Sequence, residues 1–310
     1  MLVSAASFGS GALFAKPVYA AGVDWLTLLS WRFLIGASLA WTWLLISSDR
    51  RAGLWRLSRR RVAVAFGLGL IYLGNSSTYY AALETVSASL AAVIVYIYPA
   101  VVAVLSIRVG HRLVGRRPWI ALAMTLTGVG LALGGIPAGQ VPPLLGLVEI
   151  VASPLIYSVW IVLSARLAGE RTDRVGIEAE DGASPAVATA LMMTSTGLGL
   201  WALALLFGRP VLPGQIPSAA WPGILAIGFV CTFLAIQTFY AGTRRVGAAQ
   251  ASLISTFEPV WTITLASLLF GETLGPIQLA GGALVIGGVL LAQTAGGSAT
   301  RSVTLRVADE

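Results

Sequence analysis

One carboxylate, Glu258, lies in the middle of a long apolar stretch, residues 247–270. A charge at the centre of a membrane helix costs about 2.5–3.5 kcal/mol on insertion scales, so such a residue is a functional candidate. Pro259 follows it directly and lacks the N–H that continues a helix, which predicts a kink beside the carboxylate. Glu258 could accept a proton or bind an ammonium group. The alternative is a structural ion pair or a protonated packing contact.

Two basic residues also fall inside apolar stretches. Lys16 is the one lysine among 20 basic residues, and a lysine can change its protonation on burial where arginine does not. Its ammonium either extends outward to the membrane surface or reaches a central site, where it pairs with a carboxylate or an anionic substrate group. Arg32 is expected to extend to the surface or to form a structural pair, with Glu149 as its candidate partner.

Polar and aromatic side chains occur at similar depth in several other apolar stretches. Asn75 and Tyr79 are four residues apart and share one helix face, and Trp261 shares a face with Glu258. An aromatic ring with a polar tip suits organic substrates that have flat or apolar parts, although each ring alone could equally pack. The predicted substrate-binding residues are Lys16, Asn75, Tyr79, Tyr96, Tyr98, Tyr157, Gln237, Glu258 and Trp261. Pro99 and Pro259 are candidate gating bends.

The composition excludes several classes of protein. Of 310 residues, 57% are hydrophobic and 11% charged, against about 25% charged in soluble domains. The net charge of +7 does not indicate nucleic-acid binding, because the arginines occupy short segments between apolar stretches. With one cysteine, Cys231, and one histidine, His111, we expect no catalytic residues, no metal and no cofactor. An intramembrane protease would need an embedded histidine, and His111 lies in a basic loop.

The apolar stretches predict an all-α polytopic membrane protein with ten transmembrane helices. A span needs about 20 mostly apolar residues. The predicted spans are residues 2–22, 25–47, 62–83, 87–107, 119–136, 144–165, 186–207, 218–241, 247–270 and 275–294. With the N-terminus inside, 17 of the 20 basic residues fall in inner segments and one, Arg209, falls outside. This bias predicts that both termini are cytoplasmic, with 165–185 as a solvated linker.

The sequence contains an internal repeat. Residues 80–105 align without gaps to residues 240–265, with identities that include Tyr80/Tyr240 and Pro99/Pro259. Each repeat then holds five helices, and because five is odd the two copies cross the membrane in opposite senses, an architecture common in transporters. The alignment also places Tyr98 and Glu258 at equivalent positions.

These segments resemble the EamA family of the drug/metabolite transporter superfamily. The resemblance is carried by SFGSGALFAKP with LSWRFLIGASLA, by YYAALETVSASLAAVIVYIYPAVVAVLS, and by STFEPVWTITLASLLFGETLGPIQLAGGALVIGGVLL. It departs from the family pattern at Phe8, where tryptophan is usual, and at GHRL, residues 110–113, where glutamate often follows glycine; Gly271-Glu272 keeps that pair. The resemblance implies two EamA-like repeats, predicted as residues 1–136 and 137–296, with a cytoplasmic tail at 297–310.

The sequence therefore predicts a secondary transporter, an exporter of small organic metabolites such as amino acids or related amphipathic compounds. It would work by alternating access around a midplane site in the plasma membrane. Glu258 is the candidate for proton coupling, and facilitated or exchange transport is equally open. The alternatives are efflux or flipping of drug-like or lipid-like molecules, or a channel. The expected partners are a small-molecule substrate and the lipid bilayer, without nucleic acid. Small-residue pairs such as Gly130/Gly134 and Ala283/Gly287 pack within the chain or form the seam of a homodimer.

Overall fold

The protein is all-helical throughout the part of the chain that the computed structural model describes, residues 1–55, 58–107, 116–136, 141–167, 185–239, 242, 254–255 and 257–307. The helices are α1 (Leu2–Gly9), α2 (Gly11–Ala20), α3 (Trp25–Ile46), α4 (Ser48–Trp55), α5 (Arg59–Ala82), α6 (Ala88–Val95), α7 (Tyr98–Ile107), α8 (Arg117–Gly134), α9 (Leu144–Leu167), α10 (Pro185–Leu206), η2 (Pro213–Gln215), η3 (Ser218–Ala220), α11 (Trp221–Ala226), η4 (Ile227–Leu234), α13 (Phe257–Phe270) and α14 (Pro276–Val307).

Several of these helices can cross a membrane. Four segments of the described chain are long and apolar enough to do so: Trp25–Ile46, Leu144–Leu163, Ala186–Leu206 and Ser218–Phe239. Shorter apolar helices include Trp119–Gly134, Phe257–Phe270 and Pro276–Leu291. The chain is therefore a polytopic membrane protein. The expected count of ten spans stays a prediction.

Two predicted spans are interrupted. The segment 2–22 divides at Ser10 into α1 and α2, where a Gly-Ser-Gly sequence weakens the helix. The segment 87–107 divides at Tyr96–Ile97 into α6 and α7, immediately before Pro99. A proline disfavours helical geometry in the residue before it and cannot donate to the preceding turn. The sequence predicted a bend at Pro99, and the structure has a helix break two residues earlier.

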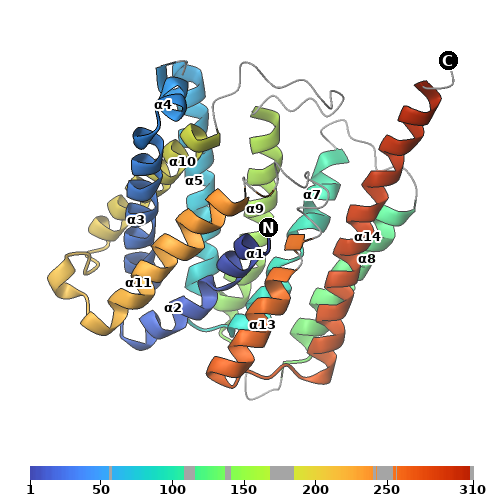
Figure 1. The fold of residues 1–310 in the computed structure, drawn as a ribbon. Helices are drawn as coiled ribbons and strands as arrows, with labels where there is room; N and C mark the ends of the chain where they lie inside the picture. Colours follow the sequence, from blue (N-terminus) through green and yellow to red (C-terminus); the bar gives the residue numbers. More distant parts are fainter. Residues whose placement is uncertain are drawn as a thin grey trace.

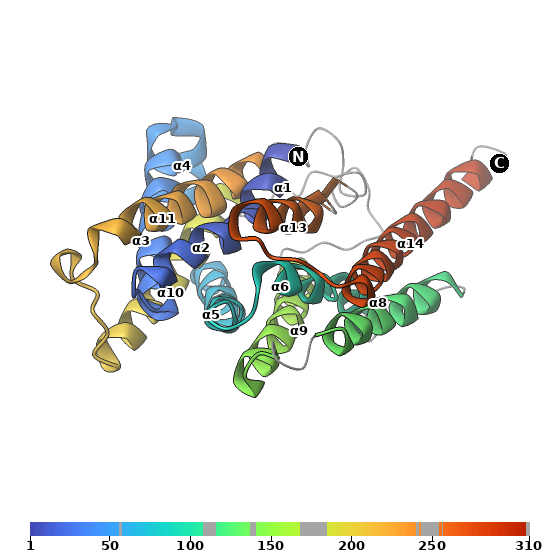
Figure 2. The same ribbon diagram turned by 90° about the horizontal axis from the view of Figure 1, so that it is seen from below.

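The helices form two groups with a central set between them (Figures 1 and 2). At one end α8 packs along α14, and at the other α3 packs against α10 and η4. The helices α6, α9 and α13 lie between the two groups. Helix α8 approaches α14 where both carry glycine, because a Cβ on Gly128 would lie 2.5 Å from the Gly281 carbonyl oxygen. Gly130 and Gly134 of the predicted small-residue pair face open space instead.

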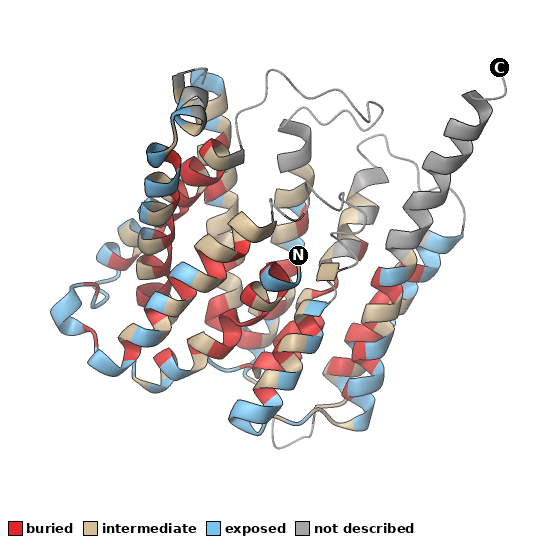
Figure 3. Ribbon diagram, viewed as in Figure 1, coloured by how far each residue is buried: buried red, intermediate tan, exposed pale blue. Residues whose placement is uncertain are grey.

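Buried positions gather toward the inside of the bundle (Figure 3). Many large apolar side chains are exposed. Leu144, Leu206 and Leu268 are each more than 70% exposed. Soluble monomers do not expose apolar surface on this scale. The arrangement is the one expected where lipid is the solvent of the outer surface.

Candidate functional site

Glu258 contacts Tyr96. The Tyr96 hydroxyl lies 3.1 Å from Glu258 Oε2 and 2.6 Å from the Ser255 carbonyl oxygen, which it can reach as donor. Tyr96 occupies the end of α6, at the break before α7, and Glu258 lies in the first turn of α13. The two predicted site residues thus meet at the break between α6 and α7. Discontinuous helices of this kind form substrate and ion sites in transporters.

A series of ring contacts leads away from Tyr96 along neighbouring helices. Tyr96 meets Tyr98 edge-on with ring centroids 5.9 Å apart, and Tyr98 meets Tyr157 of α9 at 5.0 Å. Tyr157 stacks on Trp160 at 5.6 Å, and Trp160 lies 5.3 Å from Tyr72 of α5. We call these five residues the aromatic chain. The Trp160 indole nitrogen is buried without a hydrogen-bond partner in the described part of the protein.

A buried guanidinium, that of Arg32, lies beyond Tyr72. Phe33 contacts Tyr72 edge-on at 6.0 Å, and Arg32 Cζ lies 4.8 Å from the centre of the Tyr80 ring. Arg32 Nε donates to Thr232 Oγ1 at 2.8 Å, and the residue is 6% exposed. The expectation that Arg32 extends to the surface is therefore wrong. Nor is Glu149 its partner, because the groups around Arg32 are a hydroxyl and aromatic rings.

The acceptor for Arg32 comes from an irregular helix. The segment η4 is a π-helix, in which Thr232 Oγ1 donates to the Ile227 carbonyl oxygen five residues earlier at 2.9 Å. π-Turns inside longer helices are rare and occur frequently at functional sites. Thr232 therefore connects this turn directly to the buried cation.

The predicted residue Trp261 reaches the break in the first span. Its indole N–H donates to Ser10 Oγ at 3.0 Å, and Thr262 Oγ1 donates to the Gly9 carbonyl oxygen at 2.8 Å. A Cβ on Gly9 would lie 2.9 Å from the carbonyl oxygen of Glu258. Glycine at position 9 thus lets α1 approach the backbone of α13 at the residue that carries the carboxylate.

Lys16 reaches the turn between α5 and α6. Its ammonium donates to the carbonyl oxygens of Leu83 and Val86, at 2.8 and 2.7 Å. In the same turn, the Glu272 carboxylate accepts from the backbone N–H groups of Ala88 and Ser89, at 3.0 and 2.9 Å. A cation at the end of α5 and an anion at the start of α6 both complement the helix dipoles. We therefore assign Lys16 to the structure of this turn.

Gly271 explains how Glu272 reaches that turn. Gly271 has φ +66°, and the Glu272 N–H returns to the Ala266 carbonyl oxygen at 3.4 Å. This is a glycine-terminated helix end, in which the left-handed residue reverses the chain. The Gly-Glu pair thus ends α13 and directs the carboxylate to α6.

The other predicted residues are placed less centrally. Asn75 Oδ1 accepts from Ser153 Oγ at 2.9 Å, which joins α5 to α9. Tyr79 contacts Tyr80 edge-on at 5.3 Å, so it lies on the Arg32 side of the molecule. Gln237 is half-buried in the helical turn after η4. Tyr240, Arg244, Arg245 and His111 lie outside the described residues, and so does most of the linker 165–185.

Comparison with models of protein families shows which family the chain belongs to. A model of the EamA-like transporter family matches residues 1–134 and again residues 144–294. The chain belongs to the EamA-like transporter family. It is similar to relatives that are themselves named as transporters, so this EamA-like protein is a membrane transporter.

Three curated relatives illustrate the similarity. The uncharacterized transporter YcbK of Bacillus subtilis is 27% identical over 297 residues, 91% of this chain and 87% of YcbK. An uncharacterized transporter of Archaeoglobus fulgidus is 29% identical over 231 residues, 73% of this chain and 74% of the relative. The uncharacterized inner membrane transporter YedA of Escherichia coli is 27% identical over 269 residues, 84% of this chain and 79% of YedA.

A solved crystal structure shares the fold of this EamA-like transporter. It aligns over 94% of this chain and 93% of its own, with a TM-score of 0.64 and 21% sequence identity. At that identity the match concerns the fold alone.

The sequence analysis did not predict every residue of the aromatic chain, nor the partner of Arg32 beside it. Tyr72 lies seven residues before Tyr79 on the same helix face, a spacing that could have identified it. Thr232 had no comparable signal, because its role depends on a π-turn that nothing in the apolar sequence around it indicates. Arg32 was recognised as unusual, but it was expected to extend to the surface or to form a structural pair with Glu149, and its partner is Thr232.

Proposed function

We propose that this transporter exports small organic metabolites, amino acids or related amphipathic compounds, across the plasma membrane. The observation that carries the proposal is the Glu258–Tyr96 contact at one end of the aromatic chain. An ammonium group matches the Glu258 carboxylate, and an apolar body matches the rings beside it. The unpartnered Trp160 N–H adds a donor along the same series.

The proposed mechanism is alternating access by two inverted five-helix repeats with both termini in the cytoplasm. Two observations support it: the family model matches each half of the chain, and α6 ends beside the central contact. Transporters built from inverted repeats rock one repeat against the other around a midplane site. In this scheme Pro99 and Pro259 are the bends at which the two central helices move.

Proton coupling at Glu258 is part of the same proposal. A carboxylate that binds either a proton or the substrate ammonium would exchange one for the other, which links export to inward proton movement. The Tyr96 hydroxyl shares its single proton between the Ser255 carbonyl oxygen and the Glu258 carboxylate, and it would orient the carboxylate for both ligands.

A thermal-stability screen of the detergent-purified protein tests the substrate class. The panel contains amino acids, nucleosides, purines and cationic drugs. A ligand at 100 times its Kd stabilises the native state by about 2.7 kcal/mol, which is readable as a shift in Tm. We expect amino acids or close relatives to shift the Tm of the wild type, and Glu258→Gln to lose the shift. A shift with cationic or lipid-like drugs alone would replace the proposal with drug efflux.

Transport itself is measured in proteoliposomes. We expect substrate counterflow and substrate-dependent proton movement, both lost in Glu258→Gln. Transport by Glu258→Gln with an unchanged pH dependence would remove the coupling role but leave the substrate proposal standing. A steady conductance in planar bilayers would indicate a channel and contradict alternating access.

Cysteine labelling tests the proposed topology. The chain has one cysteine, Cys231, which is buried and can be replaced before new cysteines are introduced. Single cysteines are placed in a Cys231→Ala background at Ser47, Thr85 and Arg209. We expect an impermeant thiol reagent added outside whole cells to label positions 85 and 209 but not 47. The opposite labelling pattern would invert the proposed orientation.

A further inference from the structure

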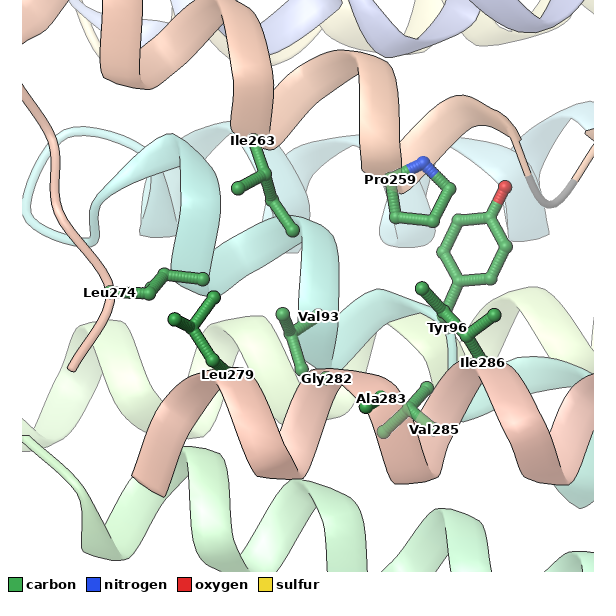
Figure 4. Close-up of a pocket in the computed structure, with 10 residues that line it drawn as sticks. All are labelled: Val93, Tyr96, Pro259, Ile263, Leu274, Leu279, Gly282, Ala283, Val285 and Ile286. Atoms are coloured by element: carbon green, nitrogen blue, oxygen red, sulfur yellow. The ribbon is translucent and has the colours of Figure 1, made fainter. Parts of the chain in front are cut away.

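An apolar pocket of about 200 Å³ lies between α6, α13 and α14, next to the Glu258–Tyr96 contact but outside it (Figure 4). Its wall consists of Val93, Tyr96, Pro259, Ile263, Leu274, Leu279, Gly282, Ala283, Val285 and Ile286. The wall is apolar except for Tyr96, whose hydroxyl is already engaged with Ser255 and Glu258. A water molecule would therefore find too few polar partners to be held there.

The pocket opens to the outer surface of the bundle. Leu279 is 54% exposed and Ala283 is also exposed, so these two residues form the mouth. The floor is closed by Val93 at 3% exposure and Val285 at 1%. Figure 4 shows these side chains converging on the space between the two helices. The pocket is thus a recess in the surface of the bundle.

This surface is continuous with the lipid-facing exterior. Elsewhere on these two helices, Ile277 of α14 is 55% exposed, and Val260 and Leu268 of α13 are 45% and 74% exposed. The recess follows α14 from Leu279 to Ile286, about 10 Å at 1.5 Å per residue. It starts one turn after the helix begins at Pro276.

We propose that the acyl chain of a membrane lipid occupies this recess between α13 and α14. The surrounding lipid supplies such chains at high local concentration, and the wall offers no free polar group, because the Tyr96 hydroxyl is already hydrogen-bonded. The chain would lie against Pro259 and Tyr96, the residue after the carboxylate and the residue that hydrogen-bonds to it. The lipid would therefore act as a fixed part of the wall that supports the Glu258 contact.

Photolabelling of the full-length protein tests the proposal. The purified protein is reconstituted into nanodiscs that contain a phosphatidylcholine with a diazirine in the middle of one acyl chain, and labelled residues are mapped by mass spectrometry. We expect labels concentrated on the wall residues of α6, α13 and α14. The buried floor residues Val93 and Val285 are the decisive positions, because a lipid on the outer surface does not reach them.

A matched pair of variants separates the recess from the general lipid boundary. Ala283→Phe fills the mouth, whereas Ala280→Phe adds the same ring to an exposed position of α14 that is not part of the wall. We expect Ala283→Phe to reduce labelling of the floor at least fivefold and Ala280→Phe to leave it unchanged. Size-exclusion profiles and Tm values show that both variants are folded.

Two results would overturn the proposal. One is labelling spread evenly over the exposed helices, with the floor no stronger than exposed positions on α9. The other is displacement of the label by transported substrate, which would make the recess part of the transport path. Neither result depends on which substrate the protein carries, so the lipid site and the proposed function can fail separately.

Discussion

Tyr96 and Glu258 are 162 residues apart in the chain, and their hydroxyl and carboxylate oxygens lie 3.1 Å apart. Each belongs to a different match of the family model, and Tyr96 lies at the end of α6. The contact thus joins the two halves of the protein at the break between α6 and α7. A movement of one half against the other must stretch or break it.

Tyr96→Phe removes the hydroxyl without changing the shape of the side chain. Hydrogen bonds to charged groups contribute about 1.5–3 kcal/mol, so we expect substrate affinity or transport rate to fall by about tenfold or more. Measurement of counterflow against substrate concentration gives the change. The control is Tyr19→Phe, whose hydroxyl donates to the Tyr80 carbonyl oxygen away from the carboxylate. Equal effects of the two variants would contradict a specific role of Tyr96.

Thr232→Val tests the buried cation. The variant keeps the branched shape but leaves Arg32 Nε without its acceptor, which we expect to reduce the free energy of unfolding by about 1–3 kcal/mol. Thr238→Val is the matched control, since its hydroxyl donates only to carbonyl oxygens of its own helix. Thermal unfolding in detergent compares them. A Thr232→Val variant as stable as Thr238→Val would show that this hydrogen bond does not hold the guanidinium.

Gly9→Ala tests the close approach of α1 to α13. The added methyl carbon would lie 2.9 Å from the Glu258 carbonyl oxygen, and overpacking of this kind costs about 1–3 kcal/mol. Gly130→Ala is the control, because a Cβ there meets nothing within 4 Å. In a helix interior that exchange stabilises by about 0.5–1 kcal/mol. We expect Gly9→Ala to lower the Tm and Gly130→Ala to leave or raise it; the reverse order would contradict the packing described.

Glu272→Gln and Lys16→Met test the turn between α5 and α6. Each removes charge-assisted hydrogen bonds to backbone groups, so we expect losses of about 1–3 kcal/mol in unfolding free energy. Because both side chains bind one turn, the double variant should lose less than the sum of the single losses. Strict additivity, measured by thermal unfolding, would show that the two side chains act independently.

Glu84, which lies between α5 and α6, should make the stability of the protein depend on pH. Its Oε1 accepts from the Trp25 N–H at 2.8 Å. Partial burial raises the pKa of Glu84 above its ordinary value of 4.5, Asp24 adds to the rise, and the Trp25 bond opposes it. A raised pKa in the folded state means that the folded protein binds the proton more tightly, so this residue's contribution to stability falls as the pH rises upward from 4.5.

We therefore expect Glu84→Gln to remove part of the decrease in Tm as the pH is raised from 4.5. Asp24→Asn is not a suitable control, because Asp24 caps α3 by accepting from Leu26 and Thr27. The wild type is compared instead with the Glu84→Gln variant over one titration of Tm against pH. Parallel curves for the two proteins would contradict the raised pKa.

Much of the architecture follows from the sequence alone. Long apolar stretches separated by arginine clusters require a helical membrane protein, because backbone polar groups must be satisfied within each segment in lipid. Glu258 could be predicted as a site residue from the sequence alone. A charge within an apolar membrane segment is energetically unfavourable unless a partner stabilises it. Motifs around it also indicated the family that the family model confirms.

Only the tertiary structure decided which partners these residues have. Tyr96, Ser10 and Thr232 acquire their roles from helix breaks and a π-turn, and hydrophobic periodicity does not encode where an apolar helix is interrupted. The hydrogen-bond partners of Lys16 and Arg32 were not predicted, for a related reason. A basic side chain can satisfy its donors with carbonyl oxygens, a hydroxyl or ring faces, and those partners come from segments 67 to 200 residues away along the chain. Composition fixes the cost of burying a charge, whereas the packing of distant helices determines what offsets it.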